Sequence, residues 1–125
     1  MQWFSFGVAM LASLGIIGIG GLYILNPGAA ARGFGLPLPD GPNIVWWLRL
    51  KGVRDIVSGL VVLAMMVWAE PRVLGIVLLI ESFTALGDMS LILAARGSTR
   101  AAFGMHGPTA ALMILAALPL IAGMA

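Results

Sequence analysis

The sequence predicts an all-α polytopic membrane protein, an up-down four-helix transmembrane bundle, from three observations. Of its 125 residues, 61% are hydrophobic and only 10% are charged, whereas a soluble domain is typically about 45–50% apolar and about 25% charged. Four apolar segments have the length of about 20 residues that a helix needs to cross a bilayer core. Most connections between them are short, so consecutive helices should be antiparallel neighbours.

The first predicted span covers about residues 3–25. It lacks a basic leader region and is longer than the apolar part of a signal peptide, so we interpret it as a span. Its many glycines predict a packing surface. Residues 26–43 follow, with four glycines and four prolines. That composition argues against a regular helix. We expect an ordinary surface loop, with a flap over the bundle mouth as the alternative.

Three further spans complete one domain covering residues 1–125, at about residues 44–69, 73–95 and 101–124. A tight connection, Glu70-Pro71-Arg72, separates the second span from the third, and proline suits the start of a helix. Each span should be helical, because a backbone in lipid must satisfy its own hydrogen bonds.

The basic residues of the connections predict the orientation. Arg32, Arg96 and Arg100 lie on one side, whereas Arg72 on the other is offset by Glu70. The positive-inside rule therefore places the first side in the cytoplasm and both termini outside the plasma (inner) membrane. Tryptophans near both faces fit two interfacial belts, namely Trp3, Trp46, Trp47 and Trp68.

Composition also limits the chemistry. The chain has no cysteine, which excludes disulfides, thiolate nucleophiles and iron–sulfur clusters. One histidine cannot form a bis-histidine haem or a histidine-rich two-metal site. We therefore expect no cofactor and no metal. The sequence pI near 10 reflects seven basic against five acidic residues at the edges of a membrane protein. The expected partners are membrane lipid and a lipophilic small molecule, and not nucleic acid.

Polar residues inside the spans gather toward the cytoplasmic side. The second span carries Lys51, Arg54, Asp55 and Ser58 at a spacing that places them on one helix face. A rise of about 1.5 Å per residue puts Arg54 and Asp55 roughly 15 Å below the start of the span. The two later spans add five more polar side chains to the same half: Glu81, Thr84, Asp88, His106 and Thr109.

The embedded charges balance, and this predicts an ion-pair network of Arg49, Lys51 and Arg54 with Asp55, Glu81 and Asp88. An isolated charge at mid-bilayer costs at least about 2.5–3.5 kcal/mol, so pairing is expected. Such a network could simply fix the helix register. Intramembrane ionisable groups are functional candidates by default, so we favour a site over a pure scaffold.

Three stretches resemble the domain-of-unknown-function family 4267, whose members are small four-span membrane proteins of DoxX-like size and topology. They are KGVRDIVSGL (51–60), ALGDMSLIL (85–93) and MHGPTAALM (105–113). The likeness extends to Tyr23, Asn26-Pro27 and the Gly35-Leu36-Pro37 loop. The resemblance implies a four-span bundle and marks as its polar positions Arg54, Asp55, Asp88 and His106. It implies no general activity.

The favoured function is a cofactor-independent enzyme that opens an epoxide, hydrates or isomerises a lipophilic small molecule. Carboxylates near an arginine in a dry pocket can hold one acid protonated and another ionised. On this hypothesis Asp55 or Asp88 is the base, Arg54 orients it, and His106 or Glu81 donates the proton. The apolar half would receive a hydrocarbon tail. Substrate contacts would come from Lys51, Trp47, Ser58, Thr84 and Thr109, although serine and threonine in helices often bond to a backbone carbonyl.

Two alternatives belong to other classes. The charges could join helices of a structural or accessory subunit, with the glycine- and proline-rich connection as its contact surface. Alternatively, Glu81 below Asp88 could relay protons in a small proton-coupled transporter component. One short bundle offers no inverted repeat, so transport would need a homo-oligomer.

Overall fold

The computed structural model describes residues 2–123, and this part of the chain contains helices and no strands. Its long helices are α1 (Gln2–Leu25), α3 (Ile44–Trp68), α4 (Pro71–Ala94) and α6 (Gly107–Ile121). Three short elements complete it: α2 (Pro27–Phe34), α5 (Thr99–Ala101) and a π-helical turn, η1 (Ala102–His106). Helices α1, α3 and α4 begin and end close to the predicted limits, whereas α6 begins later than predicted because α5 and η1 precede it.

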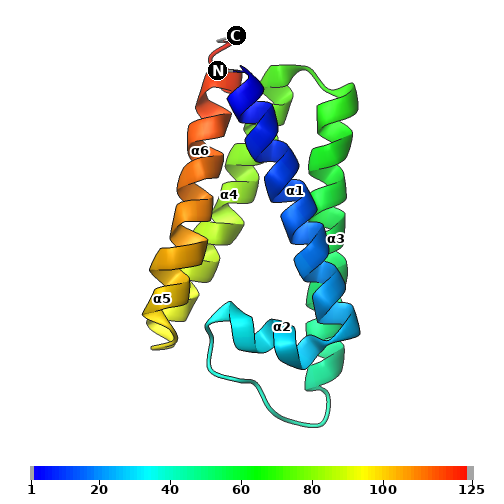
Figure 1. The fold of residues 1–125 in the computed structure, drawn as a ribbon, viewed down its shortest axis with the longest axis vertical. Helices are drawn as coiled ribbons and strands as arrows, with labels where there is room; N and C mark the ends of the chain where they lie inside the picture. Colours follow the sequence, from blue (N-terminus) through cyan, green and yellow to red (C-terminus); the bar gives the residue numbers. More distant parts are fainter. Residues whose placement is uncertain (1, 124–125) are drawn as a thin grey trace.

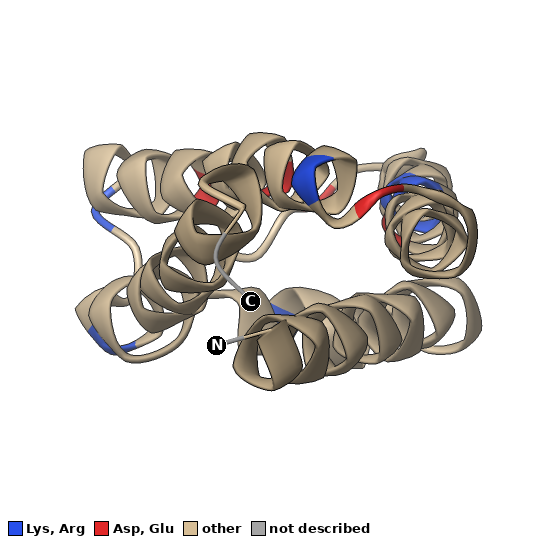
Figure 2. Ribbon diagram, turned by 90° about the horizontal axis from the view of Figure 1, so that it is seen from above, with Lys and Arg blue, Asp and Glu red and all other residues tan. Residues whose placement is uncertain are grey.

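Three helical stretches are long and apolar enough to cross a membrane: α1, α4 and the continuous segment Thr99–Ile121. They make the chain a multi-pass membrane protein by length and composition. Helix α3 is as long, at 25 residues, but its first half carries Arg49, Lys51, Arg54 and Asp55. Figure 2 shows the consequence, with acidic and basic residues on α3, α4 and the connections, and none along α1.

The long helices form two antiparallel pairs. Helix α1 packs along α3, and α4 packs along α6. The pairs meet at the end that carries both termini and diverge toward the opposite end, where α2 lies across the opening (Figure 1). The arrangement is therefore more open than an evenly packed bundle.

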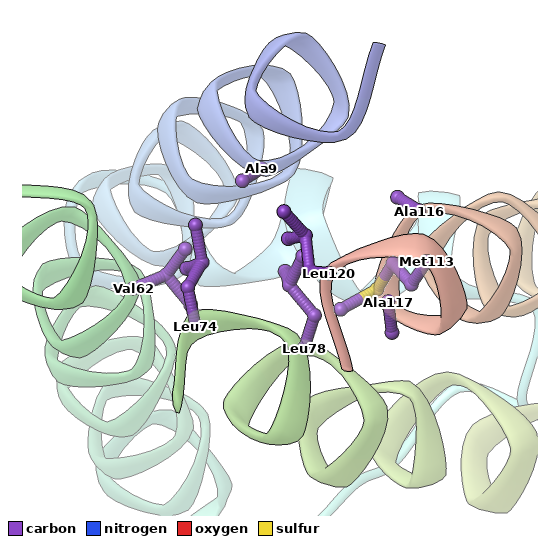
Figure 3. Close-up of a cluster of buried hydrophobic side chains, with 8 residues drawn as sticks. All are labelled: Ala9, Val62, Leu74, Leu78, Met113, Ala116, Ala117 and Leu120. Carbon is purple, nitrogen blue, oxygen red and sulfur yellow. The ribbon is translucent and has the colours of Figure 1, made fainter. Parts of the chain in front are cut away.

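A core of apolar side chains from all four long helices fills the end near the termini (Figure 3). Its buried members are Ala9, Val62, Leu74, Leu78, Met113, Ala116, Ala117 and Leu120. Burial of this kind stabilises by about 25 cal/mol per Å² relative to water, and in lipid by close packing. This half, where a hydrocarbon tail is expected to bind, is therefore packed with the protein's own apolar side chains.

Close backbone contacts hold each pair together. A Cβ on Gly20 would lie 2.6 Å from the carbonyl oxygen of Gly52, and a Cβ on Gly52 would lie 2.6 Å from that of Gly20. Gly75 of α4 is in a similar but slightly less tight position, with the Ala117 carbonyl oxygen 2.9 Å from its Cβ position. The other glycines of α1 face open space: Gly7, Gly15, Gly18 and Gly21. The predicted packing surface of α1 thus depends on one of its glycines.

Helix α2 differs from the prediction of an ordinary loop. The Asn26 side chain accepts a hydrogen bond from the Ala29 N–H at 3.3 Å, and Pro27 occupies the first turn. Gly35 ends the helix at a φ of +110°, which favours glycine. Proline at the start and glycine past the end is a common helix pattern. The loop prediction was wrong for residues 27–34 because it averaged this segment with the proline-rich stretch after it.

Candidate functional site

Helix α2 is fastened across the opening through its carboxyl end. The Ser98 N–H donates to the Gly35 carbonyl at 2.7 Å. A Cβ on Gly97 would collide with that same carbonyl, so the close approach requires glycine at position 97. His106 contacts the neighbouring Phe34 carbonyl at 3.0 Å. The end of α2 is therefore held by both the α4–α5 connection and η1.

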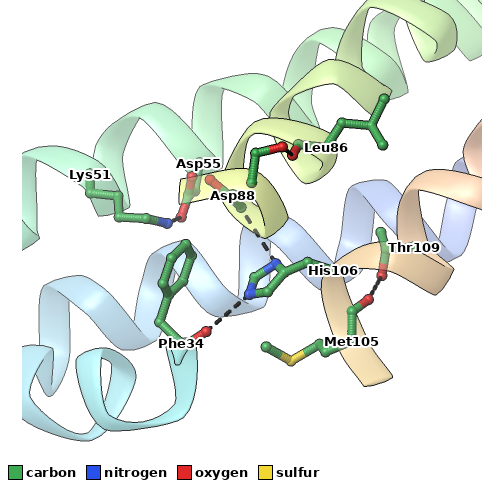
Figure 4. Close-up of polar contacts among 9 residues, drawn as sticks. Phe34, Lys51, Asp55, Leu86, Asp88, Met105, His106 and Thr109 are labelled. Carbon is green, nitrogen blue, oxygen red and sulfur yellow. Dashed lines mark hydrogen bonds and ion pairs between the residues drawn. The ribbon is translucent and has the colours of Figure 1, made fainter. Parts of the chain in front are cut away.

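Four ionisable side chains converge on the inner side of α2, and we call Lys51, Asp55, Asp88 and His106 the polar cluster (Figure 4). They come from α3, α4 and η1, which are brought together only by the fold. Asp55 and His106 are each 9% exposed. The cluster lies at the α2 end, away from the apolar core, so polar and apolar halves are segregated along the molecule.

Lys51 is held by one carboxylate and two aromatic rings. Its Nζ lies 2.8 Å from Asp55 Oδ2, one helical turn away. The same Nζ is 4.3 Å from the centroid of the Tyr23 ring and 4.9 Å from that of Phe34. A cation over an aromatic face is attracted to the ring quadrupole. Lys51 thus connects α3 to both α1 and α2.

His106 has a fixed orientation. Its Nε2 lies 3.0 Å from the Phe34 carbonyl oxygen, and its ring centroid is 4.7 Å from that of Phe34. A carbonyl oxygen only accepts, so Nε2 carries the hydrogen in this contact. Nδ1 then faces Asp88 Oδ2 at 3.8 Å. This separation exceeds a direct hydrogen bond and leaves Nδ1 available for protonation.

The π-helical turn directs His106 inward. In η1 the Gly107 N–H bonds to the Ala102 carbonyl, five residues back. Pro108 lacks an N–H and cannot bond to the Gly104 carbonyl, so the regular helical ladder is interrupted here. Single π turns insert an extra residue and occur frequently at functional sites. The His106-Gly107-Pro108 sequence therefore accounts for the position of the imidazole.

Arg54 does not join the polar cluster. Its side chain is exposed, and within residues 2–123 it forms no ion pair. Adjacent helical residues point about 100° apart, so Asp55 can face the cluster while Arg54 faces outward. Arg49 also lies elsewhere: its Nε donates to the Ile24 carbonyl at 3.2 Å, and its guanidinium lies over Trp46. The six-charge network was wrong: the described ion pairs are Lys51–Asp55 and, with a protonated imidazole, Asp88–His106.

The other candidate residues lie outside the polar cluster. The Ser58 hydroxyl donates to Glu81 Oε2 and so joins α3 to α4. Thr109 donates to the Met105 carbonyl at 2.7 Å, as helical threonines often do. Thr84 is exposed, and Trp47 is 65% exposed.

Two aromatic residues of the site were missed. Tyr23 is 2% exposed and Phe34 is half-buried, and both place a ring against Lys51. Tyr23 is the single tyrosine of the chain and lies inside an apolar span. Its phenolic hydroxyl, in an otherwise apolar segment, was a signal in the sequence that Tyr23 contacts other polar groups. The α2 pattern from Asn26 to Gly35 was the signal for Phe34.

A comparison with protein families decides the relationship. The family described as "Domain of unknown function (DUF4267)" matches residues 13–120, which include the whole polar cluster, Tyr23 and Phe34. The chain belongs to the DUF4267 family. This confirms the resemblance of its three motifs. No curated protein and no solved structure matches the chain. DUF4267 membership thus assigns no activity to the chain.

Proposed function

We propose that this DUF4267 protein is a cofactor-independent enzyme that performs acid–base chemistry on a lipophilic small molecule, with Asp88 and His106 as the proton-transfer pair. The observation that carries the proposal is the orientation of His106. Its Nε2 is held by the Phe34 carbonyl at 3.0 Å, and its Nδ1 faces Asp88 Oδ2 at 3.8 Å. Histidine beside a carboxylate is a common acid–base arrangement.

The Asp88–His106 pair suits a reaction in which one proton is removed from a reactant and another proton is donated to a reactant. In epoxide opening, ionised Asp88 accepts a proton from the attacking water as the new C–O bond forms. Protonated His106 gives its Nδ1 proton to the epoxide oxygen as the old C–O bond breaks. Proton exchange between Asp88 and His106 then restores both groups. Hydration and isomerisation use the same two transfers, and none of these reactions changes an oxidation state.

Lys51 and Asp55 would form the wall of this site. The ammonium is balanced by Asp55 at 2.8 Å and held over the Tyr23 and Phe34 rings. A neutralised pair near Asp88 keeps the cluster from accumulating negative charge. Phe34 closes the cluster from the α2 side, and a substrate would enter when this contact opens.

We also infer that α3 crosses the membrane as a fourth span, with the α2 end in the cytoplasm and both termini outside. Helix α3 has 25 residues and packs along α1, which supports a crossing beside that span. Arg32, Arg96 and Arg100 lie at the α2 end and support the cytoplasmic assignment.

The first test follows turnover of a long-chain aliphatic epoxide, 1,2-epoxyhexadecane, to the diol by mass spectrometry in protein-containing vesicles. Asp88→Asn and His106→Gln should each lower the rate at least about 100-fold. The matched control is Ser90→Ala, because Ser90 is exposed and bonds to the Leu86 carbonyl of its own helix. Folded Asp88→Asn and His106→Gln proteins that retain the wild-type rate would contradict the assignment.

A second test is independent of the substrate. The chain has one histidine, so labelling with 15N-histidine gives the signals of a single imidazole. In the labelled wild-type protein, we expect the neutral imidazole of His106 to carry its hydrogen on Nε2, the nitrogen that contacts the Phe34 carbonyl oxygen. A neutral ring that carries its hydrogen on Nδ1 would remove the geometric basis of the proposal.

A structural subunit is the second candidate. The Lys51–Asp55 pair favours it, because this pair is satisfied within one helix and needs no ligand. On this alternative Asp88→Asn would lower the folded yield in detergent, and the wild type would retain no lipophilic compound by mass spectrometry. A proton-coupled carrier is less well supported, because the apolar core fills the far end of the molecule.

A further inference from the structure

A surface cavity lies between α2, α5 and η1, at the α2 end of the molecule. It is open to the outside and has a volume of about 340 Å³. Two arginines line it, Arg32 from α2 and Arg100 from α5, and its described lining contains no carboxylate. The cavity borders Gly33 and Gly35, on either side of Phe34, but includes none of the polar cluster. It therefore forms a separate site with its own positive charge.

The cavity is built by residues that leave space. A Cβ on Gly28 would lie 3.3 Å from Arg32 Nη1, so the Arg32 side chain folds back along α2 over a glycine. Gly33 and Gly104 line the cavity, and neither has an atom within 4 Å of its Cβ position. Met105, 41% exposed, adds an apolar surface beside them. The site thus combines two arginine residues with open volume and an apolar edge.

We propose that this cavity binds the phosphate headgroup of an anionic phospholipid. Arginine recognises phosphate oxygens through paired N–H donors. The cavity lies where the apolar segment Thr99–Ile121 begins, which is the level of lipid headgroups if this segment crosses the membrane. Met105 is an exposed apolar lining residue within this segment and would contact the first carbons of the acyl chain. A free phosphate ion would lack this apolar contact, which is why we assign the site to lipid.

Binding is tested with the full chain in detergent by native mass spectrometry. The probes are dihexanoyl phosphatidylglycerol, dihexanoyl phosphatidylcholine and inorganic phosphate. We expect phosphatidylglycerol to bind at least about tenfold tighter than the other two. Equal binding of phosphatidylcholine would reduce the result to general lipid adsorption, and equal binding of phosphate would reduce it to an anion site. Either outcome overturns the proposal.

Variants locate the binding. The double variant Arg32→Gln with Arg100→Gln should lose at least about tenfold in affinity for phosphatidylglycerol. Arg72→Gln is the matched control, because Arg72 is exposed at the opposite end and bonds to the Ile121 carbonyl at 3.1 Å.

Gly104→Leu fills the open volume without a neighbouring atom in its way and should also prevent binding. Wild-type affinity in the folded double variant or in folded Gly104→Leu would overturn the assignment. Epoxide turnover is a separate readout, because this site does not depend on the proposed enzyme function.

Discussion

At the scale of single residues, Lys51 shows how a charge is accommodated in an apolar helix. Its ammonium contacts Asp55 along the same helix and the rings of Tyr23 and Phe34 from two others. Each contact is modest alone, because an exposed helical ion pair contributes about 0.3–0.5 kcal/mol. Together they desolvate the pair and make its two members interdependent. Removing one member should therefore cost more than removing both.

We predict that Asp55→Asn destabilises the protein by about 1–2 kcal/mol, because it leaves the Lys51 ammonium without its carboxylate. The effect stays below the about 3–5 kcal/mol of a fully buried pair, since the Lys51 side chain is 33% exposed. Lys51→Met retains the packing against Tyr23 and Phe34. The double variant should be closer to wild type than Asp55→Asn alone. Thermal unfolding in detergent measures all three, and strictly additive losses would contradict the coupling.

At the scale of secondary-structure elements, α2 determines whether the polar cluster is covered. The helix is only 8 residues long, and helices of that length are marginal in isolation. Its order must come from its ends: the Asn26 cap, the Gly35 turn, and the contacts of Phe34 and Gly35 with His106 and Ser98. These contacts join residues about 60–70 positions apart in sequence, which is why composition alone did not predict them.

We predict that Gly35→Ala releases α2. Alanine at a φ of +110° is strained by at least about 1 kcal/mol, and its Cβ would lie 2.6 Å from that of Ala101. Hydrogen exchange of the α2 amides should accelerate, with little change in α4. Gly33→Ala is the matched control, because its Cβ meets open space and alanine favours a helix by about 1 kcal/mol. Equal protection of α2 in the two variants would contradict this account of the helix end.

At the scale of the whole molecule, the two ends of the long helices differ in chemistry: one is apolar and the other is polar. The end near the termini is closed by packed apolar side chains (Figure 3). At the opposite end the two helix pairs diverge, and α2 covers the polar cluster between them (Figures 1 and 4). If α3 crosses the membrane, as proposed, the polar cluster faces one side of it. The assignment of that side depends on whether α3 crosses.

We predict that α3 crosses the membrane and that the α2 end faces the cytoplasm. The chain has no cysteine, so Asp40→Cys and Glu70→Cys each introduce a single thiol on either side of α3. Both positions are exposed. A membrane-impermeant maleimide should label position 70 in right-side-out vesicles and position 40 in inverted ones. Labelling of both positions in the same vesicles would show that α3 does not cross.

The long helical segments and the polarity of the two ends, but not helix α2, follow from the sequence alone. Helix α1 ends at Leu25 and α3 begins at Ile44, as predicted, because apolar length and breakers are local properties of the chain. Spacing along each helix also brought Asp55, Asp88 and His106 to the same half. These features depend on rise per residue and need no knowledge of the neighbours.

Only the tertiary structure decided which of these side chains meet. The rotation of α3 about its own axis turned Asp55 inward and Arg54 outward. Adjacent residues of a helix point about 100° apart, and the local sequence does not set the rotation of the helix precisely enough to say which of the two faces inward. The docking of α2 placed the Phe34 carbonyl on His106 and thereby selected the nitrogen that faces Asp88. Both outcomes follow from contacts between distant segments, whose geometry is set when the helices pack together.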